Sequence, residues 1–354
     1  MSIQAKIGML GIMAVLNVVL CSCAGKFYFP LNDSEVAIFP MDWREKIPAR
    51  QKSDNKSGMH AQEIAVVHPV KFAWQATQEP YTLEISSDEN FSLLRVVKTA
   101  ATEVLVYNLF ANYNYYCRVL DAQGKVVAAG TFRTADTPRW IKLPESIDKA
   151  PINFRDLGSW RTVDGRRVRQ GMIYRGADLA AWYGVSEANK RYMTEELGIK
   201  SEIDIRYAKQ VADKVNSRLG NKVKLFFRPI NAYNSFTPEQ SALFRDTIRI
   251  FADKENYPIY FHCQGGVDRT GEIAYLINGL LGVEEEQLLE DYELSSLSRF
   301  PRHRNTGYFK KWRARIASYA PAGAPVQEQV EKYLLAIGVT ADEINAIREI
   351  MLEK

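Results

Sequence analysis

The segment from residue 258 to residue 282 constrains the fold more than any other part of the chain. A short buried strand is expected at Pro258–His262, followed by a loop with two adjacent glycines and a helix over about Thr270–Leu281, closed by Gly282. Such strand–helix alternation indicates a mostly parallel central sheet flanked by helices. We therefore predict an α/β domain in this part of the chain.

The same alternation extends on both sides of this segment. Ser186 is expected to cap a helix that ends at Gly198, and strands are expected at Ser201–Arg206 and Val223–Arg228. Thr237-Pro238-Glu239-Gln240 supplies an N-cap, a proline at N1 and a capping-box glutamine for a helix to about Asp253. Two helices are expected over Val326–Glu353. The predicted α/β domain spans residues 137–354.

The loop between strand and helix has the composition of an anion-binding site with a nucleophile. Cys263 begins the loop, and a helix N-terminus with inward N–H groups would both lower the pKa of its thiol and bind an anion. Gly265 and Gly266 allow the backbone to turn these groups inward. Arg269 is placed to bind two phosphate oxygens. The predicted phosphate-binding residues are Gln264, Gly265, Gly266, Val267, Asp268 and Arg269.

Two neighbours of the loop have predicted supporting parts. The hydroxyl of Thr270 is placed to donate to the Cys263 sulfur when that sulfur is the leaving group. His262 is expected to orient the loop by hydrogen bonding rather than to act as a base. The alternative interpretation of the whole segment is a buried structural cysteine beside a glycine turn.

These residues form the pattern His-Cys-x5-Arg-Thr-Gly, and the chain resembles the bacterial tyrosine/dual-specificity phosphatase family over residues 145–350. Three upstream segments also resemble motifs of that family, namely 152–158, 173–179 and 203–206, and residues 291–295 downstream fit it as well. The resemblance implies hydrolysis of phosphomonoesters through a phosphocysteine intermediate, without a cofactor. The enzyme would be a protein-tyrosine or dual-specificity phosphatase that acts on phosphoproteins. Alternatively, its substrate would be a phosphoinositide or an inositol phosphate. A second alternative is a surface lipoprotein that binds phosphate without turnover.

The general acid has two candidates. Asp268 is preferred because the resemblance places the acid inside the loop, and Asp204, at the end of a predicted parallel strand, is the alternative. Asp204 is equally well interpreted as an ion-pair partner of Arg206 or Arg155. Asn153, Arg155 and Asp156 are expected either to brace the loop or to form a separate structural turn.

One loop position departs from the family pattern. Val267 stands where related loops that act on phosphoinositides often have lysine, which favours a phosphoprotein substrate. A basic stretch downstream could line the rim of the site instead, or could be a solvated helix face. Its residues are Arg299, Arg302, His303, Arg304, Lys310, Lys311 and Arg313.

The N-terminus has the pattern of an export signal. Lys6 precedes the apolar run Ile7–Leu20, which is too short to span a bilayer. The following residues, 20–25, resemble a bacterial lipobox with Cys23 as the lipidated residue, so residues 1–22 are the predicted signal peptide. A plain cleaved signal is the alternative. The lipobox implies a lipid-anchored protein of the bacterial cell envelope, periplasmic or on the outer surface.

A second domain is expected between the signal and the α/β domain. Residues 23–59 are predicted to be a polar linker, and residues 60–136 show short alternating strands typical of an antiparallel sandwich. The run from Leu109 to Thr134 resembles a fibronectin type III domain, which implies a spacer or a module for a protein partner. Cys117 lies on one of its strands and is expected in its core.

Composition narrows the remaining possibilities. The net charge of +4 over 354 residues is far below that of typical nucleic-acid binders, so no nucleic acid is expected as partner. The four histidines form no HExxH motif and the cysteines form no CxxC motif, so no metal is expected. The expected partners are a phosphorylated protein, small molecule or lipid, and a membrane contacted through the lipid anchor.

Overall fold

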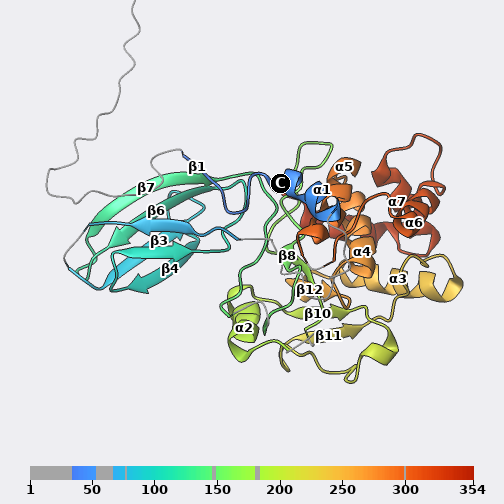
Figure 1. The fold of residues 1–354 in the computed structure, drawn as a ribbon, viewed down its shortest axis with the longest axis horizontal. Coiled ribbons are helices and arrows are strands. Elements are labelled where there is room, and N and C mark those ends of the chain that lie inside the picture. Colours follow the sequence, from blue (N-terminus) through green and yellow to red (C-terminus); the bar gives the residue numbers. More distant parts are fainter. Residues whose placement is uncertain (1–33, 53–66, 76–77, 146–148, 180–183, 299) are drawn as a thin grey trace, which may run out of the picture. The chain divides into compact units, whose positions relative to one another are not determined.

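The computed structural model describes residues 34–52, 67–75, 78–145, 149–179, 184–298 and 300–354. These residues divide into two compact units (Figure 1). The smaller comprises residues 72–104 and 116–130, and the larger comprises the described parts of 30–71, 105–115 and 131–354. The predicted signal peptide and Cys23 lie outside the described residues. No described helix is long and apolar enough to cross a bilayer.

A five-stranded sheet has the order β1-β7-β6-β3-β4. Its strands are β1 (Glu35–Val36), β3 (Tyr81–Ser86), β4 (Leu94–Thr99), β6 (Asn114–Leu120) and β7 (Val126–Thr134), and β2 (Val70–Ala73) pairs with β5 (Glu103–Val106) in a second sheet. Strands near β2, β3, β6 and β7 were predicted, whereas β1, β4 and β5 were not. The expected core position of Cys117 is confirmed, since its side chain is buried and its Sγ donates to the Gly130 carbonyl.

The larger unit contains a mixed sheet of order β11-β10-β12-β9-β8. The strands β9 (Ile173–Gly176), β10 (Ser201–Asp204), β11 (Lys224–Phe227) and β12 (Ile259–His262) are parallel, and β8 (Arg155–Asp156) is antiparallel to β9. The expected mostly parallel arrangement is therefore confirmed. In the register, Asp204 and Gly176 lie opposite His262 on either side.

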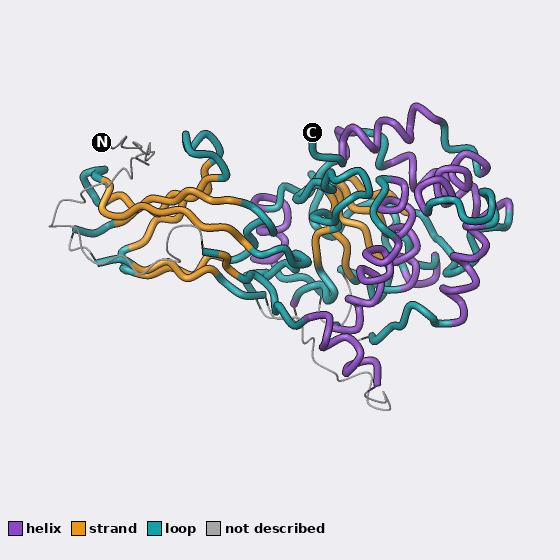
Figure 2. Tube along the Cα trace, turned by 90° about the horizontal axis from the view of Figure 1, so that it is seen from above, coloured by secondary structure: helices purple, strands orange, loops and turns teal. Residues whose placement is uncertain are grey.

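Apolar side chains on both faces of this sheet are covered. Ile173, Ile259 and Phe261 belong to the main core, which includes residues of α3 (Pro238–Ile250) and α4 (Asp268–Leu280). Tyr174 and Tyr260 point to a second core that includes residues of the π-helix η2 (Tyr192–Glu196), which continues α2 (Glu187–Arg191). Helices accordingly surround these strands in Figure 2.

Most predicted helix ends are confirmed, with one correction. The Ser186 and Thr237 side chains cap α2 and α3. However, the Gln240 side chain accepts from the Asn231 N–H at 2.7 Å, whereas a capping box would have it accept from Thr237. The C-terminal helices are α7 (Val326–Ala336) and α8 (Ala341–Met351). The helix α5 (Glu285–Glu293) was not predicted. The helix α6 (Gly307–Ala317) was anticipated only by the interpretation of Lys310, Lys311 and Arg313 as part of a helix face.

Part of the segment predicted to be a linker forms helix α1 (Trp43–Lys52). Trp43 and Ile47, one helical turn apart, are buried in the main core of the larger unit. Arg44 forms a two-point ion pair with Glu290 of α5, with Nε–Oε1 and Nη2–Oε2 distances of 2.6 and 3.0 Å. α1 also packs against the short 3-10 helix η5 (Leu294–Leu297). This helix is thus an integral element of the larger unit.

Replacing Trp43 with alanine is expected to lower the free energy of unfolding by about 3–5 kcal/mol, because a 1% exposed indole would leave a cavity in the core. Chemical denaturation followed by far-UV circular dichroism measures this change. Met41→Ala is the matched control, since Met41 is 58% exposed and its loss should cost less than about 0.5 kcal/mol. Equal stability of both variants would contradict the core role of α1.

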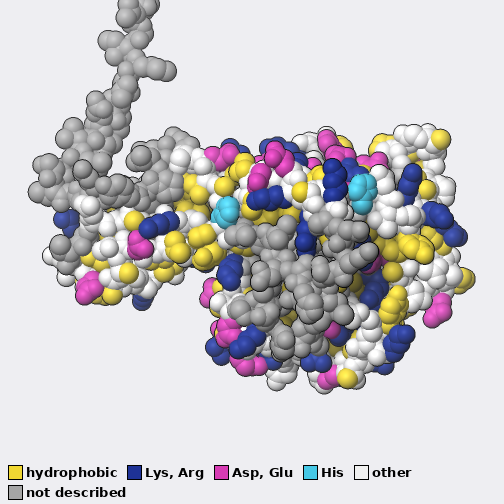
Figure 3. Space-filling model, viewed as in Figure 1, with side chains coloured by type: hydrophobic (Ala, Val, Ile, Leu, Met, Phe, Trp, Pro, Cys, Tyr) yellow, Lys and Arg dark blue, Asp and Glu magenta, His cyan; other side chains and the backbone are white. Residues whose placement is uncertain are grey.

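Charges of both signs share the surface. Among the described side chains on the face seen in Figure 3, Lys and Arg are interspersed with Asp and Glu and form no single basic patch.

Candidate active site

The predicted anion loop, residues 263–267, connects β12 to α4. Parallel neighbours, β9 and β10, flank β12 on both sides, so the loop leaves the carboxyl end of a central strand. Ligands of open parallel sheets bind at this end. Because α4 begins at Asp268, the N–H groups of its first turn are available to an anion held in the loop.

Gly266 gives the loop its shape. Its φ of +67° lies in the left-handed region, and an added Cβ would stand 2.4 Å from the carbonyl atoms of Gly176. The Gly266 carbonyl accepts hydrogen bonds from Asn153 Nδ2 at 2.8 Å and Arg175 Nη2 at 3.0 Å. The carbonyl is thereby turned to the outside of the loop. Asn153 is thus a loop-bracing residue, as one of its two interpretations predicted.

A buried carboxylate holds the arginines behind the loop. Asp291 of α5 accepts from Arg155 Nε at 3.1 Å and from Arg175 Nη1, and Arg155 also donates to Asn153. Burial alone would raise the pKa of Asp291, but the two guanidinium groups lower it below its usual value. Asp156 lies apart from this network: it pairs with Arg139, and its carboxylate accepts from the Gly158 and Gly171 N–H groups. Asp156 therefore belongs to a structural turn.

Cys263 combines burial with an environment that favours its thiolate. Burial alone would raise the pKa of this thiol, but the charge of Arg269 and hydrogen bonding with Thr270 outweigh it and lower the pKa. The Thr270 Oγ1 accepts from the Cys263 N–H at 2.9 Å, and the Thr270 side chain also forms a hydrogen bond with that of Cys263. Its donation to the sulfur as leaving group stays a prediction. Cys263 is 4% exposed but lines a surface cavity.

Cys263 is expected to react with iodoacetamide at pH 7 at least about a hundredfold faster than Cys117, because burial raises the pKa of Cys117 to about 12. At pH 7, a thiol with a lowered pKa is more ionised, whereas Cys117 stays protonated. Peptide mass spectrometry over time separates the two sites, and inorganic phosphate should slow only the reaction of Cys263. Similar rates for both thiols would show that the Cys263 thiolate is not stabilised.

His262 anchors the start of the loop. Its Nε2 lies 2.9 Å from Glu202 Oε1 and its Nδ1 lies 3.2 Å from the Cys263 carbonyl oxygen. Burial alone would lower the pKa of His262, but Asp204 and Glu202 raise it to about 9. The ring thus links Glu202 to the Cys263 carbonyl at the start of the loop, a placement that fits the orienting role predicted for it.

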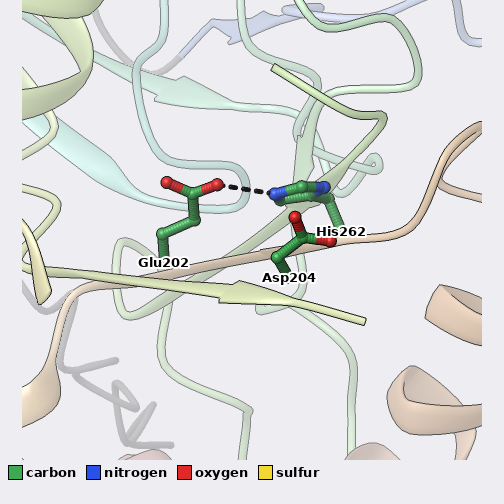
Figure 4. Close-up of side chains that lie close together, drawn as sticks. All are labelled: Glu202, Asp204 and His262. Carbon is green, nitrogen blue, oxygen red and sulfur yellow. Dashed lines mark hydrogen bonds and ion pairs between the residues drawn. The ribbon is translucent and has the colours of Figure 1, made fainter. Parts of the chain in front are cut away.

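Glu202, Asp204 and His262 form a tight group at the ends of β10 and β12 (Figure 4). One potential ligand atom from each lies within 4.8 Å of the others, so this is where the described residues could hold a metal ion. Both His262 nitrogens already lie within hydrogen-bond distance of an oxygen atom, and Asp204 accepts from Arg206 Nη2 at 2.6 Å. As it stands, the group is an internally paired set of charges beneath the loop.

Arg269 lies beside the loop, where the sequence placed it. Its Nη1 donates to the Ile205 carbonyl at 3.3 Å and to Gln210 Oε1 at 3.4 Å, and its guanidinium carbon stands 4.2 Å from the Tyr207 ring centroid. Gln210 also donates to the Gln264 side chain at 2.6 Å. Residues 205–210, which follow β10, therefore position both the arginine and one wall of the loop.

A cavity of about 390 Å³ opens over the loop. Cys263, Arg269 and Asp268 all line it, so the structure brings the main predicted residues together. Other lining residues, which the sequence did not assign to the site, are Asp178, Tyr207, Ala232 and Phe300. They come from loops after β9, β10, β11 and η5. Asp178 and Tyr207 could have been predicted from their positions after parallel strands, whereas no signal in the sequence indicated the other two. Arg302, considered for the rim, also lines the cavity; Arg299 lies outside the described residues.

The two candidate acids occupy different environments. Asp268 faces the cavity, whereas Asp204 does not line it and is bound on two points by Arg206, which also pairs with Asp178. Burial alone would raise the pKa of Asp204, but His262 and Arg206 lower it. The ion-pair interpretation of Asp204 is thus confirmed for Arg206.

Comparison with known proteins decides the family. Residues 149–353, more than half of the chain, match the model described as "Tyrosine phosphatase family". The chain belongs to the tyrosine phosphatase family. The Cupriavidus necator protein H16_A0669, which carries a provisional tyrosine-protein phosphatase name, is 26% identical over 212 residues, or 51% of this chain and 73% of that protein.

Two solved structures show a weaker likeness to this tyrosine phosphatase family member. The catalytic domain of the Saccharomyces cerevisiae PP-IP phosphatase SIW14 is 20% identical with a TM-score of 0.31, and covers 43% of this chain and 90% of its own. Pseudomonas aeruginosa TpbA is 18% identical with a TM-score of 0.32, and covers 49% and 89%. Family membership and the site geometry together make the chain a cysteine-based phosphatase.

Proposed function

We propose that this enzyme is a protein-tyrosine or dual-specificity phosphatase, which hydrolyses phosphorylated proteins through a phosphocysteine intermediate. The observation that carries the proposal is that Cys263, with a stabilised thiolate, and the Arg269 guanidinium line one cavity. Tyr207 and Phe300 give this cavity aromatic walls suited to a phenyl ring.

The chemistry proceeds in two steps. The Cys263 thiolate attacks phosphorus, the bond from phosphorus to the leaving oxygen breaks, and protonated Asp268 gives its proton to that oxygen. Asp268 then takes a proton from water, the water oxygen attacks phosphorus, and the phosphorus–sulfur bond breaks to restore the thiolate. Arg269 and the loop N–H groups hold the phosphoryl oxygens throughout.

Asp268→Asn is expected to lower turnover at least about tenfold more on phenyl phosphate than on p-nitrophenyl phosphate, because a good leaving group needs little protonation. Asp204→Asn is the comparison variant, and its effect should not depend on the leaving group. Steady-state turnover on the two substrates measures both. An equal loss on both substrates for Asp268→Asn would remove it as the acid.

A second candidate substrate class, inositol phosphates or phosphoinositides, is favoured by Arg302. This residue brings a second guanidinium to the cavity, although Val267 lacks the cation often found in related loops. A panel of phosphotyrosine, phosphoserine and phosphothreonine peptides, phosphoinositides and inositol polyphosphates separates the candidates. Higher kcat/KM on the inositol substrates than on every peptide would replace the protein-substrate proposal.

We also propose that the protein is lipid-anchored in the bacterial cell envelope through Cys23, with a fibronectin type III-like sandwich preceding the phosphatase domain. The lipobox-like residues 20–25 support the anchor, and the sheets β1-β7-β6-β3-β4 and β2-β5 support the sandwich. Partition of the wild-type protein and a Cys23→Ala variant between detergent and aqueous phases tests the anchor. Equal partition would exclude lipidation at Cys23.

A further inference from the structure

Arg302 forms a two-point ion pair with the proposed general acid. Its Nε lies 2.8 Å from Asp268 Oδ1 and its Nη2 lies 2.9 Å from Asp268 Oδ2. Both residues line the cavity that contains Cys263. A carboxylate held in this way by a guanidinium is ionised, and an ionised carboxylate has no proton to donate.

The backbone of Arg302 is fixed while its side chain reaches the cavity. The Ser296 hydroxyl accepts from the Arg302 N–H at 3.0 Å and donates to its carbonyl at 2.8 Å. Gln51 of α1 donates to the same carbonyl at 2.6 Å. The side chain is 32% exposed, so its guanidinium is accessible to an anion entering the cavity.

The other groups around Asp268 do not replace this pair. Tyr233 donates its hydroxyl to Asp268 Oδ1 at 2.6 Å, and the Tyr292 hydroxyl lies 3.4 Å from the same oxygen. Burial alone would raise the pKa of Asp268, but hydrogen bonding and charge from Arg302 lower it, helped by Tyr233 and Arg269. Among the described residues, Cys263 and Glu272 of α4 also interact electrostatically with Asp268, and both are acidic groups.

We propose that Arg302 is a positioning residue that holds Asp268 as a carboxylate in the free enzyme and transfers its guanidinium to the phosphoryl group of the bound substrate. This inference rests on the proposed mechanism, in which Asp268 is the acid. Once the guanidinium has moved, Asp268 accepts a proton, either from solvent or from a substrate monoanion. That proton is the one later given to the leaving oxygen. Binding of an anionic substrate thereby converts Asp268 to the protonated form that the first step requires.

The pH dependence of kcat/KM on phenyl phosphate tests this. In Arg302→Gln the descending limb, where the acid loses its proton, is expected to move about 1–3 pH units higher, because Asp268 loses its opposite charge. KM is expected to rise at least about tenfold, since a charge-assisted contact to phosphate is lost. Arg304→Gln is the matched control, because Arg304 lies on the same loop but pairs with Glu293 and Glu286. The descending limb of the pH profile of this variant should not move.

Proton uptake on binding provides a second readout without turnover. The full chain carrying Cys263→Ser binds sulfate, a dianion that does not titrate near pH 5, and calorimetry in buffers of different ionisation enthalpy counts the protons taken up. Uptake is expected in this protein, and should be lost when Asp268→Asn is added and reduced when Arg302→Gln is added. Unchanged uptake with Arg302→Gln, together with an unmoved pH limb, would overturn the proposal.

These results are distinguishable from failure of the proposed mechanism. If wild-type protein turns over phenyl phosphate, Cys263→Ser does not, and Asp268→Asn loses more turnover on phenyl phosphate than on p-nitrophenyl phosphate, the mechanism stands. The Arg302 variants then test the inference alone. If sulfate binding to Cys263→Ser takes up no protons, the transfer of Arg302 is refuted even though the nucleophile is established.

Discussion

Cys263→Ser is expected to reduce turnover of p-nitrophenyl phosphate by at least about 10⁴-fold while phosphate binding remains measurable. The pKa of a serine hydroxyl lies far above that of the Cys263 thiol. The serine therefore stays protonated, and the attacking anion is lost. The groups that bind phosphate, namely the loop N–H groups and Arg269, are unchanged. Turnover is measured by release of nitrophenolate and binding by calorimetry.

Cys117→Ser is the matched control for this experiment. Cys117 is also buried, but it donates to the Gly130 carbonyl and does not line the cavity, so turnover should persist. Residual turnover of Cys263→Ser close to that of the wild-type protein would place the nucleophile elsewhere. Loss of both turnover and phosphate binding, with a changed circular dichroism spectrum, would instead indicate a misfolded loop.

Asp291→Asn is expected to lower the free energy of unfolding by about 3–5 kcal/mol, because two buried guanidinium groups, Arg155 and Arg175, would lose their shared carboxylate. Turnover should also fall, since Arg175 positions the Gly266 carbonyl. The pKa of Asp291 is lowered in the folded protein, so its stabilisation is fully present above the unfolded-state pKa of about 3.9 and is lost as the pH falls through the folded-state pKa.

The difference in stability between wild-type and Asp291→Asn should therefore shrink in acid. Urea titrations at pH 7 and at successively lower pH measure it. Asp164→Asn is the control, because the Asp164–Arg166 pair is about half exposed on both sides and should contribute less than about 1 kcal/mol. A stability loss for Asp291→Asn no larger than that of the control would show that the arginines find other partners.

The loop could be predicted from the sequence because its chemistry is local. The nucleophile, the two glycines and Arg269 lie within seven residues, and the preceding strand and following helix have clear patterns of their own. The brace behind the loop could not be predicted with the same certainty. Asp291 lies 136 residues from Arg155 and 116 from Arg175, and no local pattern reports such a contact.

Helix α1 and the Arg302–Asp268 pair were missed for related reasons. In α1 the buried face consists of Trp43 and Ile47 among charged residues and an internal proline, a pattern that resembles a polar linker. Arg302 was one of several basic residues in a stretch whose orientation the sequence does not encode locally. That its guanidinium meets Asp268 depends on the path of the chain after η5.

The position of α1 bears on where the catalytic part of this protein can be cut. A gene fragment starting at residue 137 would omit a helix that supplies two core side chains and the amide that holds the Arg302 carbonyl. Such a fragment would expose apolar surface on α5 and η5. The loop that carries Arg302, beside the proposed acid Asp268, would also lose the hydrogen bond from Gln51. Its solubility and activity would then understate those of the intact protein. Fragments intended for crystals or assays should begin before Phe39, a buried residue of the same core as Trp43 and Ile47.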